Sequence, residues 1–289
     1  MKKILLLIVL ISSLHLTAQN DGWRISTNDR SDYTGIAIAN GRIGMLSSSK
    51  PLKIKHIVLN NVYDVDPNLK VSQILHGMNF GSLDLYIDGE KITESNITNW
   101  QQTMDMKNAA LTTSFDFQNK ATVSYTVFAL RNIQYTGYMD ISIEASKEID
   151  IKVTGKILVP KEYQTPKNKF QILKDLETTM PILQSVAKSP FGKHLVSTSG
   201  TFIWHHINSS RERQRPELSH QIVSDYENTL SFNYKIKKNQ NLNFAWTGAQ
   251  CTTKNFADPK SESERMVIFN LLNSRDVLLA GHKALWEKL

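Results

Sequence analysis

The stretch LTTSFDFQNKATVSYTV, residues 111–127, indicates the fold of this 289-residue chain. Apolar and polar side chains alternate on both sides of Asn119-Lys120, a dipeptide that suits a turn. Since successive side chains of a strand point to opposite faces, each half predicts a β-strand with one buried face. Two such strands joined by a short turn pair antiparallel, so the stretch predicts a hairpin.

The same alternation continues outward in both directions. It recurs in five further segments: residues 83–88, 139–144, 149–153, 230–236 and 242–246. The dipeptides Asn40-Gly41 and Asp88-Gly89 tolerate the positive φ angles that tight hairpins require. Strands this close in sequence favour antiparallel pairing, and half-buried strands favour two sheets packed face to face. We therefore expect a mainly β fold, a large antiparallel two-sheet super-sandwich.

The middle of the chain is less regular. Four prolines fall within residues 159–193. We interpret this segment as long connections that cross the sandwich, because proline is rare inside central strands. No repeat or low-complexity tract suggests a domain boundary here, so one sandwich domain is predicted over residues 19–258.

The pattern changes after Pro259, where apolar residues recur at helical spacing. Ser261 and Ser274 are candidate helix N-caps, each followed by an acidic residue within the next three positions. One face of the second helix carries Leu278, His282, Leu285 and Leu289. The sequence supplies no glycine or proline to end this helix. We predict a helical linker over residues 259–289, with an apolar face that is expected to pack against a neighbouring domain.

Residues 1–18 have the composition of a secretory signal peptide. Lys2 and Lys3 precede an apolar run over residues 4–11, and Ala18 is the expected cleavage position. The run is too short to span a bilayer. We therefore expect a secreted or periplasmic bacterial protein that is free of the membrane after cleavage.

The remaining composition argues against several classes of site. The single cysteine, Cys251, excludes an internal disulfide. The net charge is +7, but the basic residues are scattered and accompany no nucleic-acid-binding module, so no nucleic-acid partner is expected. Residues 64–75 begin like a calcium loop, yet leucine occupies its sixth and twelfth positions in place of glycine and glutamate. We predict no metal site and no cofactor.

Three stretches carry a resemblance to a known family. They are Trp23 followed by Asn40-Gly-Arg-Ile-Gly44, the segment Trp100–Leu111, and the segment Ser274–Leu289 with its His282 and Trp286. Together they resemble the N-terminal domain of glycoside hydrolase family 65. The Asn-Gly-Arg-Ile-Gly piece is also similar to the opening of family 95 α-L-fucosidases, which is the alternative. The terminal helix favours family 65.

The family 65 resemblance implies a function for the whole enzyme. Such enzymes act on α-glucosides, as hydrolases or phosphorylases that invert the anomeric centre. Inversion by hydrolysis needs a carboxylic acid and a carboxylate base on opposite sides of the sugar. In the family, these groups lie in an (α/α)6 barrel after the linker helix, and that barrel is absent from this sequence. The resemblance therefore implies a non-catalytic domain, inactive alone, whose partner is the barrel.

Four residues are candidates for binding. Asn40 and Arg42 belong to the family-like hairpin, and Trp204 and His205 form an aromatic and imidazole patch that suits an α-linked glucoside. His206 points to the opposite strand face from His205, so the two cannot chelate one metal ion together in the simple way. A half-buried strand is the alternative for this patch. A free-standing carbohydrate-binding or protein-binding sandwich is the alternative for the whole chain.

Overall fold

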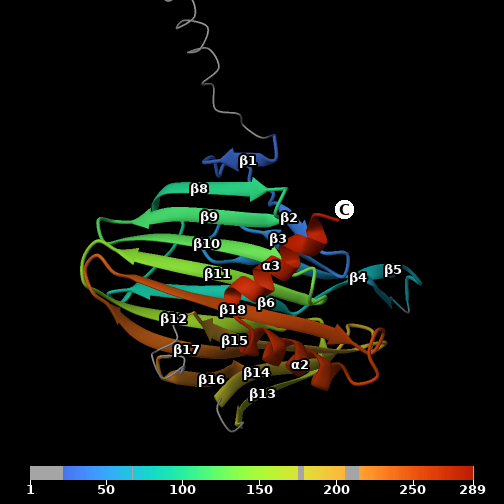
Figure 1. Cartoon of the computed structure of the whole chain (residues 1–289). Coiled ribbons are helices and arrows are strands. Elements are labelled where there is room, and N and C mark those ends of the chain that lie inside the picture. The colour runs from blue at the N-terminus through green and yellow to red at the C-terminus, as the bar shows by residue number, and fades with distance from the viewer. Residues whose placement is uncertain (1–21, 67, 175–178, 206–214, 289) are drawn as a thin grey trace, which may run out of the picture.

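The computed structural model describes residues 22–66, 68–174, 179–205 and 215–288. Its strands form three antiparallel sheets (Figure 1). The largest sheet contains, in spatial order, β1 (Arg24–Thr27), β8 (Thr98–Asp105), β9 (Ala110–Phe117), β10 (Ala121–Ala129), β11 (Thr136–Ala145), β18 (Asn241–Thr252), β15 (Leu195–Trp204), β14 (Thr179–Lys188) and β13 (Gln164–Lys174). The predicted signal peptide lies outside the described residues.

Two smaller sheets form the second layer. One contains β16 (Leu218–Ser224), β17 (Glu227–Ile236), β12 (Ile149–Leu158), β6 (Asn79–Ile87) and β7 (Glu90–Lys91). The other contains β2 (Ala37–Ala39), β3 (Ile43–Ser47), β4 (Ile54–Val65) and β5 (Ser72–His76). An isolated antiparallel bridge between Lys53, which precedes β4, and Ser82 on β6 connects the two sheets. The mainly β sandwich is confirmed, with a second layer divided between two sheets.

The hairpin predicted over residues 111–127 is confirmed. Strands β9 and β10 are paired along their length: Phe117 lies opposite Ala121 next to the turn, and Leu111 lies opposite Val127 at the other end. The apolar positions of this hairpin face inward, and Phe115 and Val123 are almost fully buried. Alternation therefore identified both the strands and the face that each one buries.

The core between the layers is rich in aromatic side chains. The Phe202 ring packs edge to face against two others. Its centroid lies 5.0 Å from that of Phe232 and 4.7 Å from that of Trp246. The indole Nε1 of Trp246 donates a hydrogen bond of 2.5 Å to the Phe80 carbonyl. Gly155 on β12 lets the sheets approach, because a Cβ there would lie 2.5 Å from the Trp246 ring.

The prediction of long connections over residues 159–193 is wrong over most of that range. Within this range, Gln164–Lys174 and Thr179–Lys188 form β13 and β14, which pair with each other at one end of the large sheet. Pro166 falls within a register shift of the edge strand, where no ladder hydrogen bond is required of it. Pro181 precedes Leu183, where pairing of β14 with β15 begins. Pro166 and Pro181 thus occupy positions that strands tolerate, and Pro160 and Pro190 lie outside the strands.

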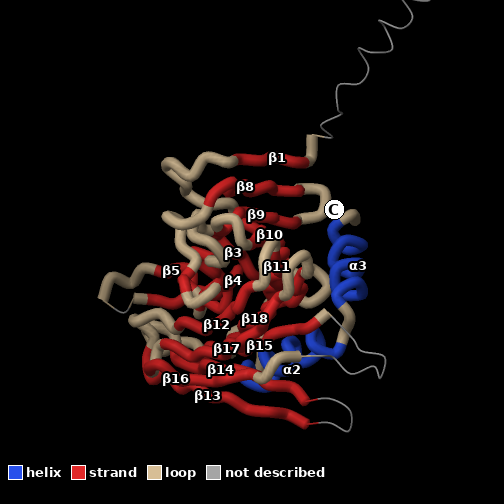
Figure 2. Tube along the Cα trace, turned by 90° about the vertical axis from the view of Figure 1, so that its left-hand side faces the viewer, coloured by secondary structure: helices blue, strands red, loops and turns tan. Residues whose placement is uncertain are grey.

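Two helices, α2 (Pro259–Leu272) and α3 (Arg275–Trp286), lie on the outer face of the nine-stranded sheet (Figures 1 and 2). The change from strands to helices after residue 258 is as predicted. Asp258, not Ser261, is the N-cap of α2, because Pro259 occupies the first helical position and the Asp258 side chain accepts from the Lys260 and Ser261 amides. Ser274 caps α3 as predicted. No helix among the described residues has the length and hydropathy of a membrane span.

We expected the apolar face of the last helix to lack a neighbour within this chain. That expectation is wrong for Leu278 and His282. Leu278 and His282 are each 1% exposed, because they pack on the outer face of the sheet. Their neighbours come from β10, β11, β15 and β18 and include Phe128, Tyr138 and Ala245. Leu285 is 38% exposed, and Leu289 lies outside the described residues.

Candidate functional site

Helix α3 is held to the sheet by hydrogen bonds to two loops. The Nδ1 atom of His282 accepts from the Arg131 amide at 3.1 Å, and its Nε2 donates to the Asn108 carbonyl at 3.0 Å. Because one nitrogen must accept and the other donate, the imidazole is neutral with its proton on Nε2. Burial lowers the pKa of His282, which favours the same neutral form.

Two further contacts complete this attachment. The Asn132 amide donates to the Leu278 carbonyl at 3.0 Å, and the Trp286 indole donates to the Met106 carbonyl at 2.8 Å. We call the contacts of Asn132, His282 and Trp286 the α3 latch. The latch orients the helix that ends the described chain.

The first turn of α3 is joined to the sheet by an ionic cluster. One Asp140 oxygen lies 2.9 Å from His205 Nε2, and the other accepts from Arg275 Nε at 2.6 Å. Burial lowers the pKa of Arg275, but its contact with Asp140 raises that pKa further, so the net shift is upward. Beside this cluster lies a polar hollow of about 410 Å³, walled also by Ser142 and Asn243.

The predicted binding residues Asn40 and Arg42 lie in the turn between β2 and β3. Asn40 is 4% exposed, and its side chain donates to the Leu130 carbonyl at 2.7 Å and accepts from the Arg42 and Ile43 amides. The Arg131 guanidinium donates to the Asn40 carbonyl at 3.1 Å. Asn40 thus supports the loop that receives His282, while the Arg42 side chain is exposed.

Trp204 and His205 lie on opposite faces of β15 and its continuation. Trp204 is 6% exposed and packs between the sheets, 4.6 Å from the Phe232 ring centroid. Its ring therefore offers no platform to a sugar from solvent. His205 lies in the polar hollow with Asp140, and His206 falls outside the described residues. The structure does not bring the four predicted residues into one site.

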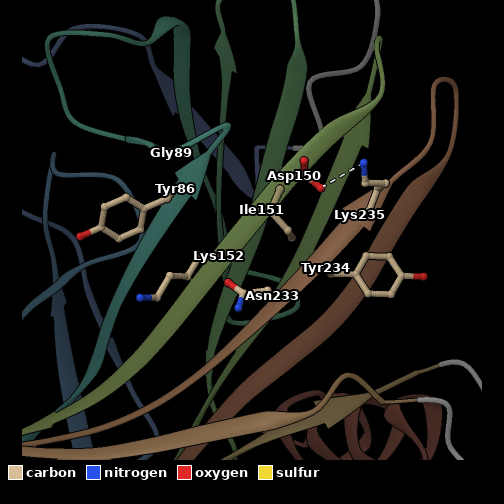
Figure 3. A pocket seen from close by; sticks show the side chains of 8 residues that line it. All are labelled: Tyr86, Gly89, Asp150, Ile151, Lys152, Asn233, Tyr234 and Lys235. Atoms are coloured by element: carbon tan, nitrogen blue, oxygen red, sulfur yellow. Dashed lines mark ion pairs between the residues drawn. The ribbon is translucent and has the colours of Figure 1, made fainter.

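A larger hollow, of about 670 Å³, lies on the five-stranded sheet (Figure 3). Tyr86 on β6, Lys152 on β12 and Asn233 on β17 are partners across neighbouring strands. An ion pair between Asp150 and Lys235, at 3.5 Å, lies at its rim. No motif in the sequence distinguishes these residues, and only their polar positions in the alternation mark them as outward-facing.

The acidic residues that resemble a calcium loop have structural partners. Asp64 is 3% exposed and accepts from the Phe191 amide at 2.8 Å. Asp66 accepts from the amides of Asn68 and Leu69. Across the described residues, no group of three histidine, cysteine, aspartate or glutamate side chains is arranged to hold a metal ion.

Comparison with known proteins identifies the family. The sequence profile described as glycosyl hydrolase family 65, N-terminal domain, matches residues 26–289. This chain belongs to glycosyl hydrolase family 65. The match covers the sandwich and both helices, as the resemblance implied, and it decides against family 95.

Curated relatives of this family 65 chain are longer than it is. A kojibiose hydrolase from Flavobacterium johnsoniae is 32% identical over 284 residues, which cover 98% of this chain and 41% of the relative. A kojibiose hydrolase from Mucilaginibacter mallensis is 30% identical, over 93% of this chain and 40% of the relative. The chain thus spans about two-fifths of the length of these relatives.

A solved structure supports the family 65 fold. It is described as a kojibiose phosphorylase from the human microbiome, and it covers 91% of this chain with a TM-score of 0.69 and 13% identity. The match covers 37% of that protein. At this identity the similarity concerns the fold alone.

Proposed function

We propose that this chain is the N-terminal domain of a longer, exported family 65 enzyme, and that α2 and α3 dock the enzyme's catalytic barrel. The profile match to the N-terminal domain supports this assignment. So does the length of the kojibiose hydrolases, of which this chain spans about two-fifths. The signal-like residues 1–18 support export.

The observation that carries the docking surface is the outer side of the two helices. Phe269, Leu272 and Val277 are 49%, 55% and 58% exposed, although they are large apolar residues. They flank the joint between α2 and α3, and Leu285 extends the apolar surface along α3. Grouped exposed apolar side chains mark interaction surfaces. A barrel that follows α3 in the sequence reaches this surface directly.

The carboxyl groups whose pKa is clearly shifted in the described residues lack the shift that acid catalysis requires. A glycosidase acid needs a raised pKa so that it is protonated near neutral pH. In the described part of the chain, every carboxyl group with a clearly shifted pKa is shifted downward; these are Asp29, Asp84, Asp88, Asp105 and Asp258. Burial raises the pKa of Asp84, yet Lys53, Lys91 and Lys156 hold it well below its usual range. Together with the match to the N-terminal domain of the family, this supports our proposal that the acid and base belong to the barrel.

The parent enzyme is proposed to act on an α-linked glucoside, and kojibiose is the first candidate because both curated relatives carry its name. The purified chain alone is expected to release no glucose from kojibiose. Glucose release by the chain, measured with a coupled glucose assay and absent from a mock purification, would contradict the assignment of catalysis to the barrel.

Docking is tested by co-expressing this chain with the catalytic segment encoded by the same gene. Leu272→Asp and Val277→Asp place charges on the proposed surface, and each is expected to reduce co-purification of the catalytic segment at least about tenfold, because an unpaired buried charge is costly. Ile222→Asp is the matched control, since Ile222 is 48% exposed on β16 of the other layer. Undiminished co-purification by both helix variants, or a gene without a catalytic segment, would refute the proposal.

A further inference from the structure

The five-stranded sheet presents an open face away from the helices. In Figure 2, α2 and α3 lie on one side of the molecule, and β16 lies toward the other. The hollow over β6, β12 and β17 occurs in this second layer. A domain docked on α2 and α3 would therefore leave this hollow accessible.

Three side chains of the hollow stand in one row. Tyr86 pairs with Lys152, and Lys152 pairs with Asn233. Residues directly opposite each other on antiparallel strands share a face of the sheet, so the three side chains project together. Figure 3 shows Tyr86 and Lys152 on the same side of the strands. The row measures about 10 Å from the first strand to the third, because neighbouring strands lie about 4.8 Å apart.

The chemistry of this row suits a sugar. The Tyr86 ring is half-buried and borders the hollow, and Lys91 Nζ lies over the ring at 5.9 Å from its centroid. A flat apolar ring can contact the C–H face of a pyranose on the side that Lys91 does not cover. Lys152 and Asn233 are exposed, and within the described residues neither side chain has a hydrogen-bond or ion-pair partner. Ammonium and amide groups supply donors, and the amide also supplies an acceptor, for sugar hydroxyls.

The charge balance favours a neutral ligand. Lys235 lies 3.4 Å from Glu148 and 3.5 Å from Asp150, so its charge is compensated at the rim. Lys152 then leaves one unpaired positive charge in the hollow. A polyanion site needs a concentrated positive surface, which this arrangement lacks.

We propose that the hollow of Tyr86, Lys152 and Asn233 is a saccharide-binding site for neutral gluco-oligosaccharides. A sugar ring stacks on Tyr86, and its hydroxyls bond to Lys152 and Asn233. The volume of about 670 Å³ falls in the range of small-molecule sites. The inference rests on the proposed function, because the choice of gluco-oligosaccharides follows from a parent enzyme that acts on an α-linked glucoside.

Titration of the full chain with kojibiose and maltotriose, followed by saturation-transfer NMR, tests the site. The chain is expected to bind at least one of them saturably, and Tyr86→Ala is expected to weaken binding about tenfold, equivalent to about 1.4 kcal/mol. Tyr63→Ala is the matched control: Tyr63 is 43% exposed on β4, in a different sheet, and does not line this hollow. The control variant is expected to bind as the unchanged chain does.

Asn233→Ala provides a second variant at an exposed position that folding tolerates, with binding expected to weaken several-fold. Absence of saturable binding by the unchanged chain would overturn the proposal, as would equal loss in the Tyr86 and Tyr63 variants. Preferential binding of heparin over both neutral sugars would also overturn it. The α2 and α3 docking variants leave this hollow intact, so failure of barrel docking and failure of sugar binding are distinguishable.

Discussion

Helices α2 and α3 cover the same sheet face with different proportions of apolar contact and hydrogen bonding. Helix α2 buries Met266, Val267 and Leu271 against β14, β15 and β18, and its buried Ser263 and Asn270 also form hydrogen bonds to the sheet. Helix α3 buries one aliphatic residue, Leu278, and relies on the α3 latch and on the Asp140–Arg275 pair. The free energy gained by burying apolar side chains does not depend on their orientation or on pH. A hydrogen bond depends on the distance and angle between donor and acceptor, and on the donor carrying its proton. We infer that the attachment of α3 depends more on pH and on single polar contacts than the attachment of α2 does.

The largest effect is expected from Leu271→Ala in α2. Removal of this buried side chain, 5% exposed, leaves a cavity under the helix. The free energy of unfolding is expected to fall by about 3 kcal/mol, as for other large-to-small core substitutions. Urea denaturation followed by circular dichroism measures this. Leu272→Ala, at the exposed neighbouring position, serves as the control and is expected to change the free energy of unfolding by less than about 0.5 kcal/mol.

A smaller and more local effect is expected from His282→Ala in α3. The substitution leaves the Arg131 amide and the Asn108 carbonyl without their partner, at a cost of about 2 kcal/mol. Hydrogen exchange should accelerate in α3 while exchange in α2 stays unchanged. Lys283→Ala, whose side chain is 52% exposed, is the control. Equal acceleration in both helices would contradict the distinction between them.

The latch is expected to weaken in mild acid. Burial lowers the pKa of His282 below its ordinary 6.5, so the unfolded or undocked state binds more protons just below that pH. The stabilisation from neutral His282 is complete above about pH 6.5 and is lost as the pH falls toward the lowered pKa. A proton on Nδ1 would oppose the Arg131 amide. The rate of amide hydrogen exchange in α3, corrected for intrinsic rates, should increase as the pH is lowered from 7.5 to 5. This increase should disappear in His282→Ala.

The smallest effect is expected from Arg275→Ala. The Arg275 side chain is 42% exposed, so solvent screens its pair with Asp140 and the loss is about 0.5 kcal/mol. The difference between variant and unchanged chain should shrink in high salt, since salt screens exposed ion pairs. A loss that is independent of salt would show that packing of the Arg275 chain matters more than its charge.

Sequence reasoning succeeded where a local pattern carries the information. The alternation of residues 111–127 predicted two paired strands, and Asp88-Gly89 predicted a tight turn that has φ angles of 50° and 81°. It failed over residues 159–193, because whether a proline interrupts a ladder depends on which neighbour the strand pairs with. That pairing brings together segments distant in sequence.

The candidate sites show the same limit. Asn40, His205 and His282 were visible as unusual residues, but their partners Leu130, Asp140 and Asn108 were not. Each partner is a backbone carbonyl or an ordinary outward-facing polar residue. Such positions carry no distinctive residue type that could reveal a contact 65 to 174 residues away.

The sequence by itself determined the β-rich class, the change to helices after residue 258 and the family, because periodicity and short motifs are local properties. The tertiary structure decided that the second layer is divided between two sheets, that the face of Leu278 and His282 is covered, and that Tyr86, Lys152 and Asn233 share one hollow. Those outcomes depend on strand register and on the sheet face that receives the helices. Register and face are set by packing across the whole domain, which no short segment encodes alone.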